Sequence, residues 1–242
     1  MPNQIPLIVD RRGSVLSLSL NNPSKKNALN SEIMGALFAA IDETKKYEEL
    51  RAIVIRGEGS VFCSGADVKN WKPNQLQMLL KSIVECSLPT IAEVNGACLG
   101  GGMGLICACD FVVAKDSTRF GFPEVRIGMI PAVILPYVAR KISLSKIREL
   151  FITGEKFGNS RAKSLGILYN ESNLNELISK IEKGGPNAQK EIKSMLNKDI
   201  ISKSSSVRDT ELAHLISSIR EGSECVEGIN SFLEKRQPKW GK

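Results

Sequence analysis

The stretch Gly-Gly-Gly-Met-Gly at residues 100–104 is the most informative part of this chain, because of the segments that flank it. An apolar run over 89–94 precedes it and the apolar segment 105–110 follows, so we expect a strand, a glycine turn and a buried helix. The first N–H groups of a helix have no intrahelical partner, and the helix dipole favours negative charge there. The stretch therefore predicts a site for an anion or a developing oxyanion, with close backbone packing as the alternative.

The composition is that of an ordinary globular chain. Its 242 residues are 42% hydrophobic and 24% charged, which fits one large domain or one domain with an appendage. No apolar run approaches the roughly 18 residues that span a membrane, and residues 1–12 lack the apolar centre of a signal peptide. We therefore expect a cytoplasmic protein with no membrane contact.

Metal and histidine chemistry have little support in the sequence. The six cysteines lie mostly in apolar surroundings, where free cysteine behaves as a small hydrophobe. His214, the single histidine, lies in a helical stretch, and no Cys-x-x-Cys occurs. We expect no metal site and no histidine-based triad. The net charge of +7 would attract phosphates, nucleic acid or a polyanionic cofactor, or would simply be a lysine-rich solvated surface.

The first half of the chain alternates between strand and helix patterns. Strands are predicted at 16–20, 52–55, 91–94 and 111–114, and helices at 31–44 and 73–87. From residue 131 onward the pattern is largely helical, which indicates α/β packing followed by a helical appendage. The last helix carries Val226, Ile229 and Leu233 on one stripe, which must pack against this subunit or a neighbour.

Three further motifs accompany the glycine stretch, at residues 22–29, 61–69 and 120–131. Together with residues 95–102, they resemble the crotonase superfamily, the enoyl-CoA hydratase/isomerase family, in order from about residue 15 to Lys235. The resemblance implies an α/β fold with the crotonase (ClpP/crotonase-like) ββα superhelical core and a C-terminal helical region. We expect the core to span residues 1–190 and a helical trimerisation region to span residues 191–242.

The resemblance also implies a catalytic site for acyl-CoA thioesters. An enolate-like intermediate would be held by two backbone N–H groups, which by motif position belong to Ala66 and Gly101, and Glu124 would transfer the proton. Backbone donors are uncharged and preorganised, and each contributes roughly 3 kcal/mol of transition-state stabilisation. An apolar pocket should raise the pKa of Glu124, and its expected walls are Phe122, Ile130, Ile134 and Tyr137.

Coenzyme A would bind as part of the substrate, and no permanently bound cofactor is expected. A Phe-x-x-Lys segment near the C-terminus is commonly supplied by a neighbouring subunit in this family, which implies a homotrimer or a dimer of trimers. The positions that match CoA-binding residues of the family are Lys25, Lys26, Ala28, Ala66, Asp67, Val68, Phe232 and Lys235.

One position departs from the usual hydratase pattern. Hydratases of the family usually carry a glutamate three residues after the middle glycine, where this chain has Gly104. A single carboxylate, Glu124, can either shift a double bond or activate one water and return the same proton. Residues 100–105, 123–128 and 130–138 together most resemble a single-glutamate branch that is usually described as hydratases. That branch is associated with methylglutaconyl-CoA and related branched or carboxylated substrates. We therefore predict an enoyl-CoA hydratase, with an enoyl-CoA isomerase as the alternative.

Other interpretations stay open. A decarboxylase or thioesterase would use the same oxyanion hole. An RNA-binding role is permitted by the positive charge but opposed by the 5% aromatic content, so nucleic acid is not the expected partner. A non-catalytic assembly subunit would need Glu124 to be idle, for example as a helix cap or as a partner of Arg126. Acyl-chain length and branching would depend on loop positions within residues 69–79.

Overall fold

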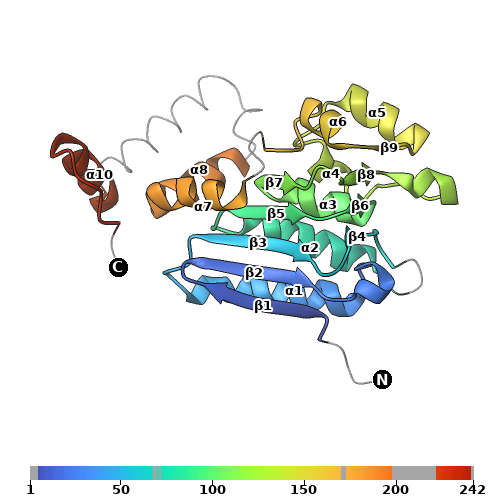
Figure 1. Cartoon of the computed structure of the whole chain (residues 1–242), viewed down its shortest axis with the longest axis horizontal. Coiled ribbons are helices and arrows are strands. Elements are labelled where there is room, and N and C mark those ends of the chain that lie inside the picture. The colour runs from blue at the N-terminus through green and yellow to red at the C-terminus, as the bar shows by residue number, and fades with distance from the viewer. Residues whose placement is uncertain (1–4, 68–69, 71, 170–172, 198–221, 241–242) are drawn as a thin grey trace.

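A computed structural model describes residues 5–67, 70, 72–169, 173–197 and 222–240 (Figure 1). The predictions for Val68 and His214 concern residues outside these ranges, and the side chains of Phe232 and Leu233 are not described either. The described part holds strands, α-helices and short 3-10 helices, in the order β1 (Leu7–Arg12), β2 (Val15–Leu20), η1 (Pro23–Lys25), α1 (Ser31–Glu43), η2 (Thr44–Lys46), β3 (Ala52–Gly57), β4 (Val61–Cys63), α2 (Pro73–Glu85), β5 (Thr90–Val94), β6 (Ala97–Leu99), α3 (Gly101–Ala108), β7 (Phe111–Ala114), β8 (Arg119–Gly121), η3 (Pro123–Ile127), α4 (Leu135–Val138), α5 (Leu144–Thr153), β9 (Lys156–Phe157), α6 (Asn159–Ser164), α7 (Leu174–Lys183), α8 (Pro186–Asn197) and α10 (Ser223–Leu233).

The larger sheet has the strand order β1-β2-β3-β5-β7 within the described residues. β1 and β2 form an antiparallel hairpin, and each later strand is added in parallel. A parallel neighbour requires a crossover, and α1, α2 and α3 lie between successive strands of this sheet. The four strands predicted from apolar patterning are therefore confirmed, whereas β1 was missed because its sequence mixes apolar and charged residues.

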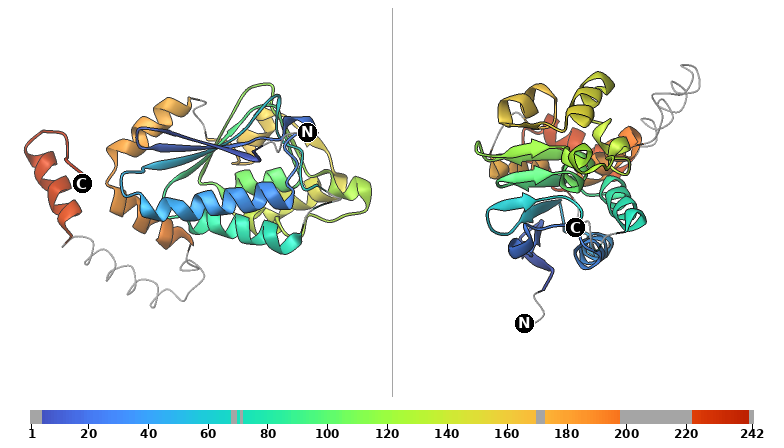
Figure 2. Two further views of the ribbon diagram at one scale, coloured as in Figure 1. Left: turned by 90° about the horizontal axis from the view of Figure 1, so that it is seen from below. Right: turned by 90° about the vertical axis from the view of Figure 1, so that its right-hand side faces the viewer.

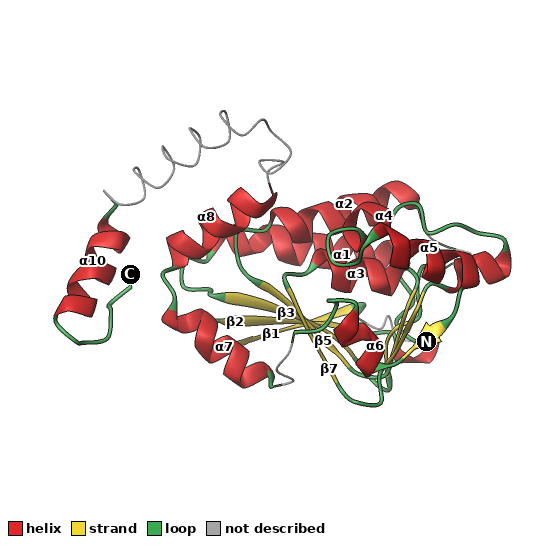
Figure 3. Cartoon of the chain, turned by 90° about the horizontal axis from the view of Figure 1, so that it is seen from above, coloured by secondary structure: helices red, strands yellow, loops and turns green. Residues whose placement is uncertain are grey.

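Both faces of this sheet are covered by helices, as seen from above in Figure 3 and from below in Figure 2. In β3, Ile53 and Ile55 pack into the main core with α1, α2 and α3, because alternate side chains of a strand point to opposite faces. Ala52 and Val54 face the other way, where they pack with apolar residues of α7. A strand buried on both faces has the continuous apolar sequence that β3 shows.

A second, smaller sheet was not predicted. It has the order β4-β6-β8-β9, and its strands are two or three residues long within the described part of the chain. Each of its first three strands follows a strand of the larger sheet, so the chain passes from β3 to β4, from β5 to β6 and from β7 to β8. This repeated step is the ββα superhelix expected from the resemblance. Segments this short give no readable periodicity, which explains the omission.

The C-terminal part of the described chain is mainly helical, as predicted. The boundary expected between residues 190 and 191 falls inside α8, so the division into a core and a trimerisation region stays a prediction. Glu224 of α10 accepts hydrogen bonds from the Asn187 and Ala188 N–H groups, which fastens α10 to the start of α8. None of the described helices is both long and apolar enough to cross a membrane.

Candidate active site

The Ala66 N–H group is left without an acceptor by the way its turn is held. Leu29 pairs with Ala66 in a parallel bridge, in which the Leu29 N–H donates to the Gly65 carbonyl at 2.8 Å and the Asp67 N–H donates to the Leu29 carbonyl at 3.0 Å. In such a parallel pair Leu29 bonds to the two residues that flank Ala66, and the N–H of Ala66 itself points away from Leu29. Among the described residues, none accepts a hydrogen bond from the Ala66 N–H.

Gly101 supplies a second free donor beside it. Gly101 begins α3, and its N–H likewise has no acceptor in the described part of the chain. The preceding Gly100 has φ +50°, and its own N–H donates to the Gly121 carbonyl at 3.0 Å. A Cβ atom placed on Gly101 would lie 3.2 Å from the Ala66 nitrogen, so glycine keeps the space between the two donors open. The glycine stretch therefore forms the predicted turn and helix start.

Glu124 faces this pair of donors from η3. Its Oε1 lies 3.1 Å from the position that a Cβ on Gly100 would take. Its Oε2 is buried and has no hydrogen-bond partner among the described residues. Burial raises the pKa of the Glu124 carboxyl above its ordinary value, and a hydrogen bond from its own backbone partly offsets this rise.

Arg126 does not pair with Glu124. The Arg126 Nε donates to the Gly154 carbonyl at 2.9 Å, at the C-terminal end of α5. The arginine thus ties η3 to α5, and the interpretation of Glu124 as half of an ion pair with Arg126 is not what the structure shows.

One cavity of about 780 Å3 contains all three predicted catalytic positions. Of the four walls expected for it, Ile130 and Ile134 line it, but Phe122 and Tyr137 do not. Phe122 packs in the core against Phe151, and the Tyr137 hydroxyl donates to the Gln77 carbonyl. Within the segment 69–79, α2 begins at Pro73, and Pro73 and Leu76 of this helix line the cavity. The cavity is lined by Ser64, Gly65, Ala66, Pro73, Leu76, Gly100, Gly101, Pro123, Glu124, Arg126, Ile127, Gly128, Met129, Ile130, Pro131, Ala132, Val133 and Ile134.

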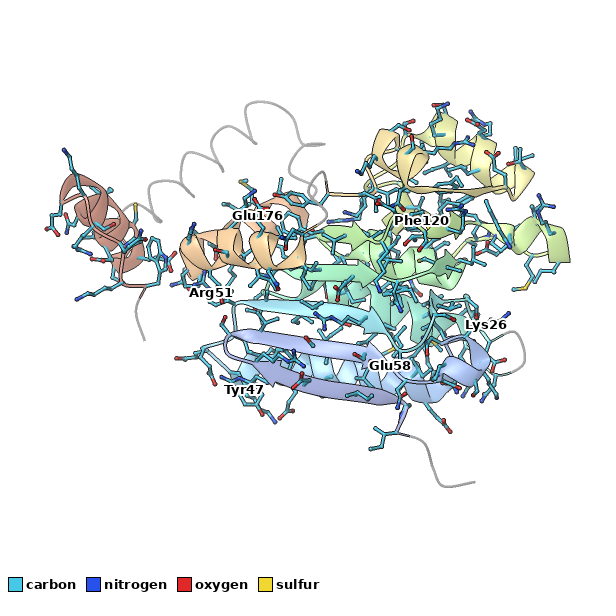
Figure 4. The ribbon with its side chains drawn as sticks, viewed as in Figure 1. Lys26, Tyr47, Arg51, Glu58, Phe120 and Glu176 are labelled. Carbon is cyan, nitrogen blue, oxygen red and sulfur yellow. The ribbon has the colours of Figure 1, made fainter. Side chains whose placement is uncertain are left out.

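The segment predicted to bind CoA lies beside the Ala66 turn. The Ser64 N–H donates to the Lys26 carbonyl at 3.0 Å, so residues 25–29 and 64–67 run side by side. The side chains of Lys25 and Lys26 are exposed, and Figure 4 shows Lys26 at the end of the molecule away from Arg51. The structure thus brings Lys25, Lys26, Ala28, Ala66 and Asp67 together.

Asn27 is a residue whose role sequence reasoning missed. It is fully buried and has φ +52°, a backbone conformation that asparagine tolerates better than most residues. Its side chain accepts a hydrogen bond from the Asn22 N–H and donates to the carbonyls of Glu58 and Val61, at 2.7–2.9 Å. The only signal in the sequence was an asparagine in a polar turn, which does not reveal partners more than 30 residues away.

The segment that holds Phe232 and Lys235 is not brought to this cavity in the single chain. α10 lies at the opposite end of the molecule from η1 and α3 in Figure 1. Lys235 itself is exposed.

Comparison with known proteins identifies the family of this chain. The family model described as "Enoyl-CoA hydratase/isomerase" matches residues 10–242. A probable enoyl-CoA hydratase of Bacillus subtilis is 30% identical, with 98% of each chain covered. A 2,3-dehydroadipyl-CoA hydratase of Escherichia coli is 29% identical, covering 96% of this chain and 97% of the relative.

A solved structure extends the comparison to the fold. Pseudomonas aeruginosa AtuE superposes with a TM-score of 0.91 at 29% identity, covering 98% of this chain and all of that one. The chain therefore belongs to the enoyl-CoA hydratase/isomerase family and has the crotonase fold, and it is an enzyme of that family.

Proposed function

We propose that this protein is an enoyl-CoA hydratase that adds water reversibly to the 2,3 double bond of an enoyl-CoA thioester. The observation that carries the proposal is the pairing of two acceptor-free N–H groups, at Ala66 and Gly101, with the buried carboxyl of Glu124 around one cavity. Uncharged donors suit an oxygen that becomes negative only during the reaction, because they stabilise that charge without titrating.

In the proposed reaction the thioester oxygen accepts hydrogen bonds from Ala66 and Gly101. The Glu124 carboxylate removes a proton from water while the water oxygen bonds to Cβ of the acyl group. The electron pair of the double bond moves towards the thioester, and the resulting enolate is stabilised by roughly 3 kcal/mol per donor. Protonated Glu124 then returns the proton to Cα, which completes hydration and restores the carboxylate.

A double-bond isomerase is the second candidate, because position 104 provides no second acid or base. The same donors would hold the enolate while Glu124 moved a proton between two carbons of the acyl chain. The likeness of residues 100–105, 123–128 and 130–138 to the methylglutaconyl-CoA-hydratase-like branch supports branched or carboxylated enoyl-CoAs as substrates.

The CoA portion of the substrate is assigned to the segment around Lys25, Lys26 and Ala28 and to the Ala66–Asp67 turn. Val68 belongs to the same assignment. In a homotrimer or a dimer of trimers, Phe232 and Lys235 would come from a neighbouring subunit. The side-by-side placement of residues 25–29 and 64–67 supports the first part of this assignment. The cytoplasmic location stays a prediction.

The decisive experiment incubates the pure protein with crotonyl-CoA in deuterated water and follows the mass of the product. Gain of water establishes the hydratase and shows that one glutamate suffices. Deuterium uptake without gain of water establishes proton transfer alone and favours the isomerase. If neither change occurs with crotonyl-CoA or with branched enoyl-CoAs, the proposed activity is wrong.

A further inference from the structure

Ile134 fills the space beside the second turn of α3. Gly104 follows Gly101 by three residues, so the two lie on the same face of the helix, about 4.5 Å apart along its axis. A Cβ on Gly104 would lie 2.5 Å from Cγ2 of Ile134 and 3.2 Å from Cδ1 of Leu80. No side chain at position 104 fits unless Ile134 moves.

Ile134 also separates Gly104 from the cavity. Ile134 lines the cavity with the donors at Ala66 and Gly101, whereas Gly104 is not among the lining residues. Ile134 is only 2% exposed, so the core encloses the sides of its side chain that do not face the cavity. The Ile134 carbonyl accepts hydrogen bonds from the Tyr137 and Val138 N–H groups of α4, which fixes the backbone of Ile134.

The proposed position of the thioester places the acyl chain close to Ile134. If the thioester oxygen is held at Ala66 and Gly101, Cα and Cβ of the acyl group lie only one and two bonds beyond the carbonyl carbon. The next turn of α3, about 4.5 Å along the helix, is therefore within reach of substituents on these carbons. Ile134 covers that turn, so such substituents meet its side chain.

We propose that Ile134 is a specificity-determining residue that limits the bulk of the acyl group at Cβ, by filling the space that Gly104 leaves open. This inference rests on the proposed function only in placing the thioester at Ala66 and Gly101. A smaller residue at position 134 opens a space lined by Gly104 and Leu80, next to the reacting carbons. The enlarged cavity then accepts substrates with a methyl branch at Cβ better than the native cavity does.

The kinetic test compares crotonyl-CoA with 3-methylcrotonyl-CoA in Ile134→Ala and Ile134→Val. We expect the ratio of kcat/KM for the branched over the straight substrate to rise about tenfold or more in Ile134→Ala, since one methyl group in an apolar pocket is worth that much discrimination. Ile134→Val should give a smaller rise. Ile142→Val is the matched control, because Ile142 is also 2% exposed but does not line the cavity.

A binding test keeps this inference separate from the proposed activity. Butanoyl-CoA and 3-methylbutanoyl-CoA have no double bond to hydrate. Titration calorimetry with these two ligands gives the ratio of their Kd values, which measures the preference for a branched acyl group without turnover. We expect the ratio to shift towards the branched ligand in Ile134→Val and to stay unchanged in Ile142→Val. An unchanged ratio in the Ile134 variants overturns the specificity role even if hydration is observed. Binding that shifts as expected without any turnover overturns the activity alone, and a native protein that binds neither ligand overturns both.

Discussion

At Glu124, the proposed general base, the requirements of catalysis and of stability oppose each other. Its carboxyl is largely buried and faces two free backbone donors rather than a cation. Burial disfavours the charged form, which raises the pKa and brings the group closer to the pH at which a general base works best. The same burial makes the ionised native state less favourable at neutral pH.

Replacing Glu124 by glutamine should therefore remove activity and increase stability. We expect kcat to fall about 10²–10⁴-fold, because proton transfer is lost. When folding raises the pKa of a carboxyl, the contribution of that group to stability is fully present below its pKa in the unfolded chain. The contribution is lost as the pH rises through its pKa in the folded protein. Glu124→Gln should accordingly have a higher melting temperature than the native protein at pH 7.5, and the difference should vanish below about pH 4.

Thermal unfolding at both pH values, together with turnover of crotonyl-CoA, checks this prediction. Glu48→Gln is the control, because Glu48 is exposed on the surface between η2 and β3. Full activity in Glu124→Gln would remove Glu124 from the mechanism. An unchanged melting temperature would show that burial of the ionised Glu124 carboxylate does not destabilise the folded protein.

Asn27 provides a second prediction at this scale. Its amide nitrogen donates to two backbone carbonyls, so Asn27→Asp places a carboxylate against two acceptors in a buried site. We expect a loss of about 2–3 kcal/mol in the free energy of unfolding, since buried groups lose their partners. Asn27→Gly tolerates φ +52° but lacks the amide, so it separates backbone strain from hydrogen bonding. Urea unfolding measures both; if Asn27→Gly is as stable as the native protein, the amide is not what holds the turn.

The contrast between these residues shows what could be predicted from the sequence. Ala66, Gly101 and Glu124 each lie in a short contiguous motif, and the structure brings the three together around one cavity. Asn27 and the Gly104–Ile134 contact depend on residues about 30 positions away, and no local pattern reveals such pairs. Phe122 and Tyr137 were wrongly assigned to the cavity wall because closeness in sequence to Glu124 does not determine which way a side chain points.

At the scale of elements, the site is built at the C-terminal ends of three strands of the smaller sheet. Four of the five strands of the larger sheet were predictable from their apolar patterning, whereas β4, β6 and β8 are only three residues long. Yet these short strands lead directly into the Ala66 turn, the glycine turn before α3, and η3 with Glu124. Ala66, Gly101 and Glu124 therefore follow three successive strands of the smaller sheet, which explains how segments some 60 residues apart converge.

Lys193 fastens α8 to the core and gives a prediction for an element. Its Nζ donates to Asp110 Oδ2 at 2.7 Å and to the Leu88 carbonyl at 2.9 Å, and its side chain is only 9% exposed. Removing one member of a buried ion pair leaves the other charge uncompensated, so Lys193→Met should cost about 3–5 kcal/mol in the free energy of unfolding.

The control lies on the same helix. Lys190 of α8 is exposed, and Lys190→Met should change stability by less than about 0.5 kcal/mol. Denaturant unfolding of both variants makes the comparison. If Lys193→Met matches Lys190→Met, the buried pair does not anchor α8.

At the scale of the whole molecule, α10 lies at one end, away from α3, whose first residue, Gly101, lines the cavity (Figure 1). Val226 and Ile229 on α10 are about half exposed, at 48% and 47%. An apolar stripe on a helix is normally buried against another element, so α10 lacks part of its packing against the described residues. This arrangement favours the prediction that Lys235 serves the active site of a neighbouring subunit.

Mixing two impaired variants tests that prediction directly. Lys235→Glu should raise KM for the acyl-CoA substrate with kcat little changed, because the substrate phosphates meet a like charge. Glu124→Gln should be inactive but keeps a native Lys235. When the two are unfolded, mixed and refolded together, symmetric assembly puts a native Lys235 beside some Glu124-containing sites, and activity with the native KM should reappear. If Lys235 does not act at all, Lys235→Glu alone would keep the native KM. If Lys235 acted within its own chain, each site with a functional Glu124 would have the glutamate at position 235. The mixture would then show only the KM of Lys235→Glu.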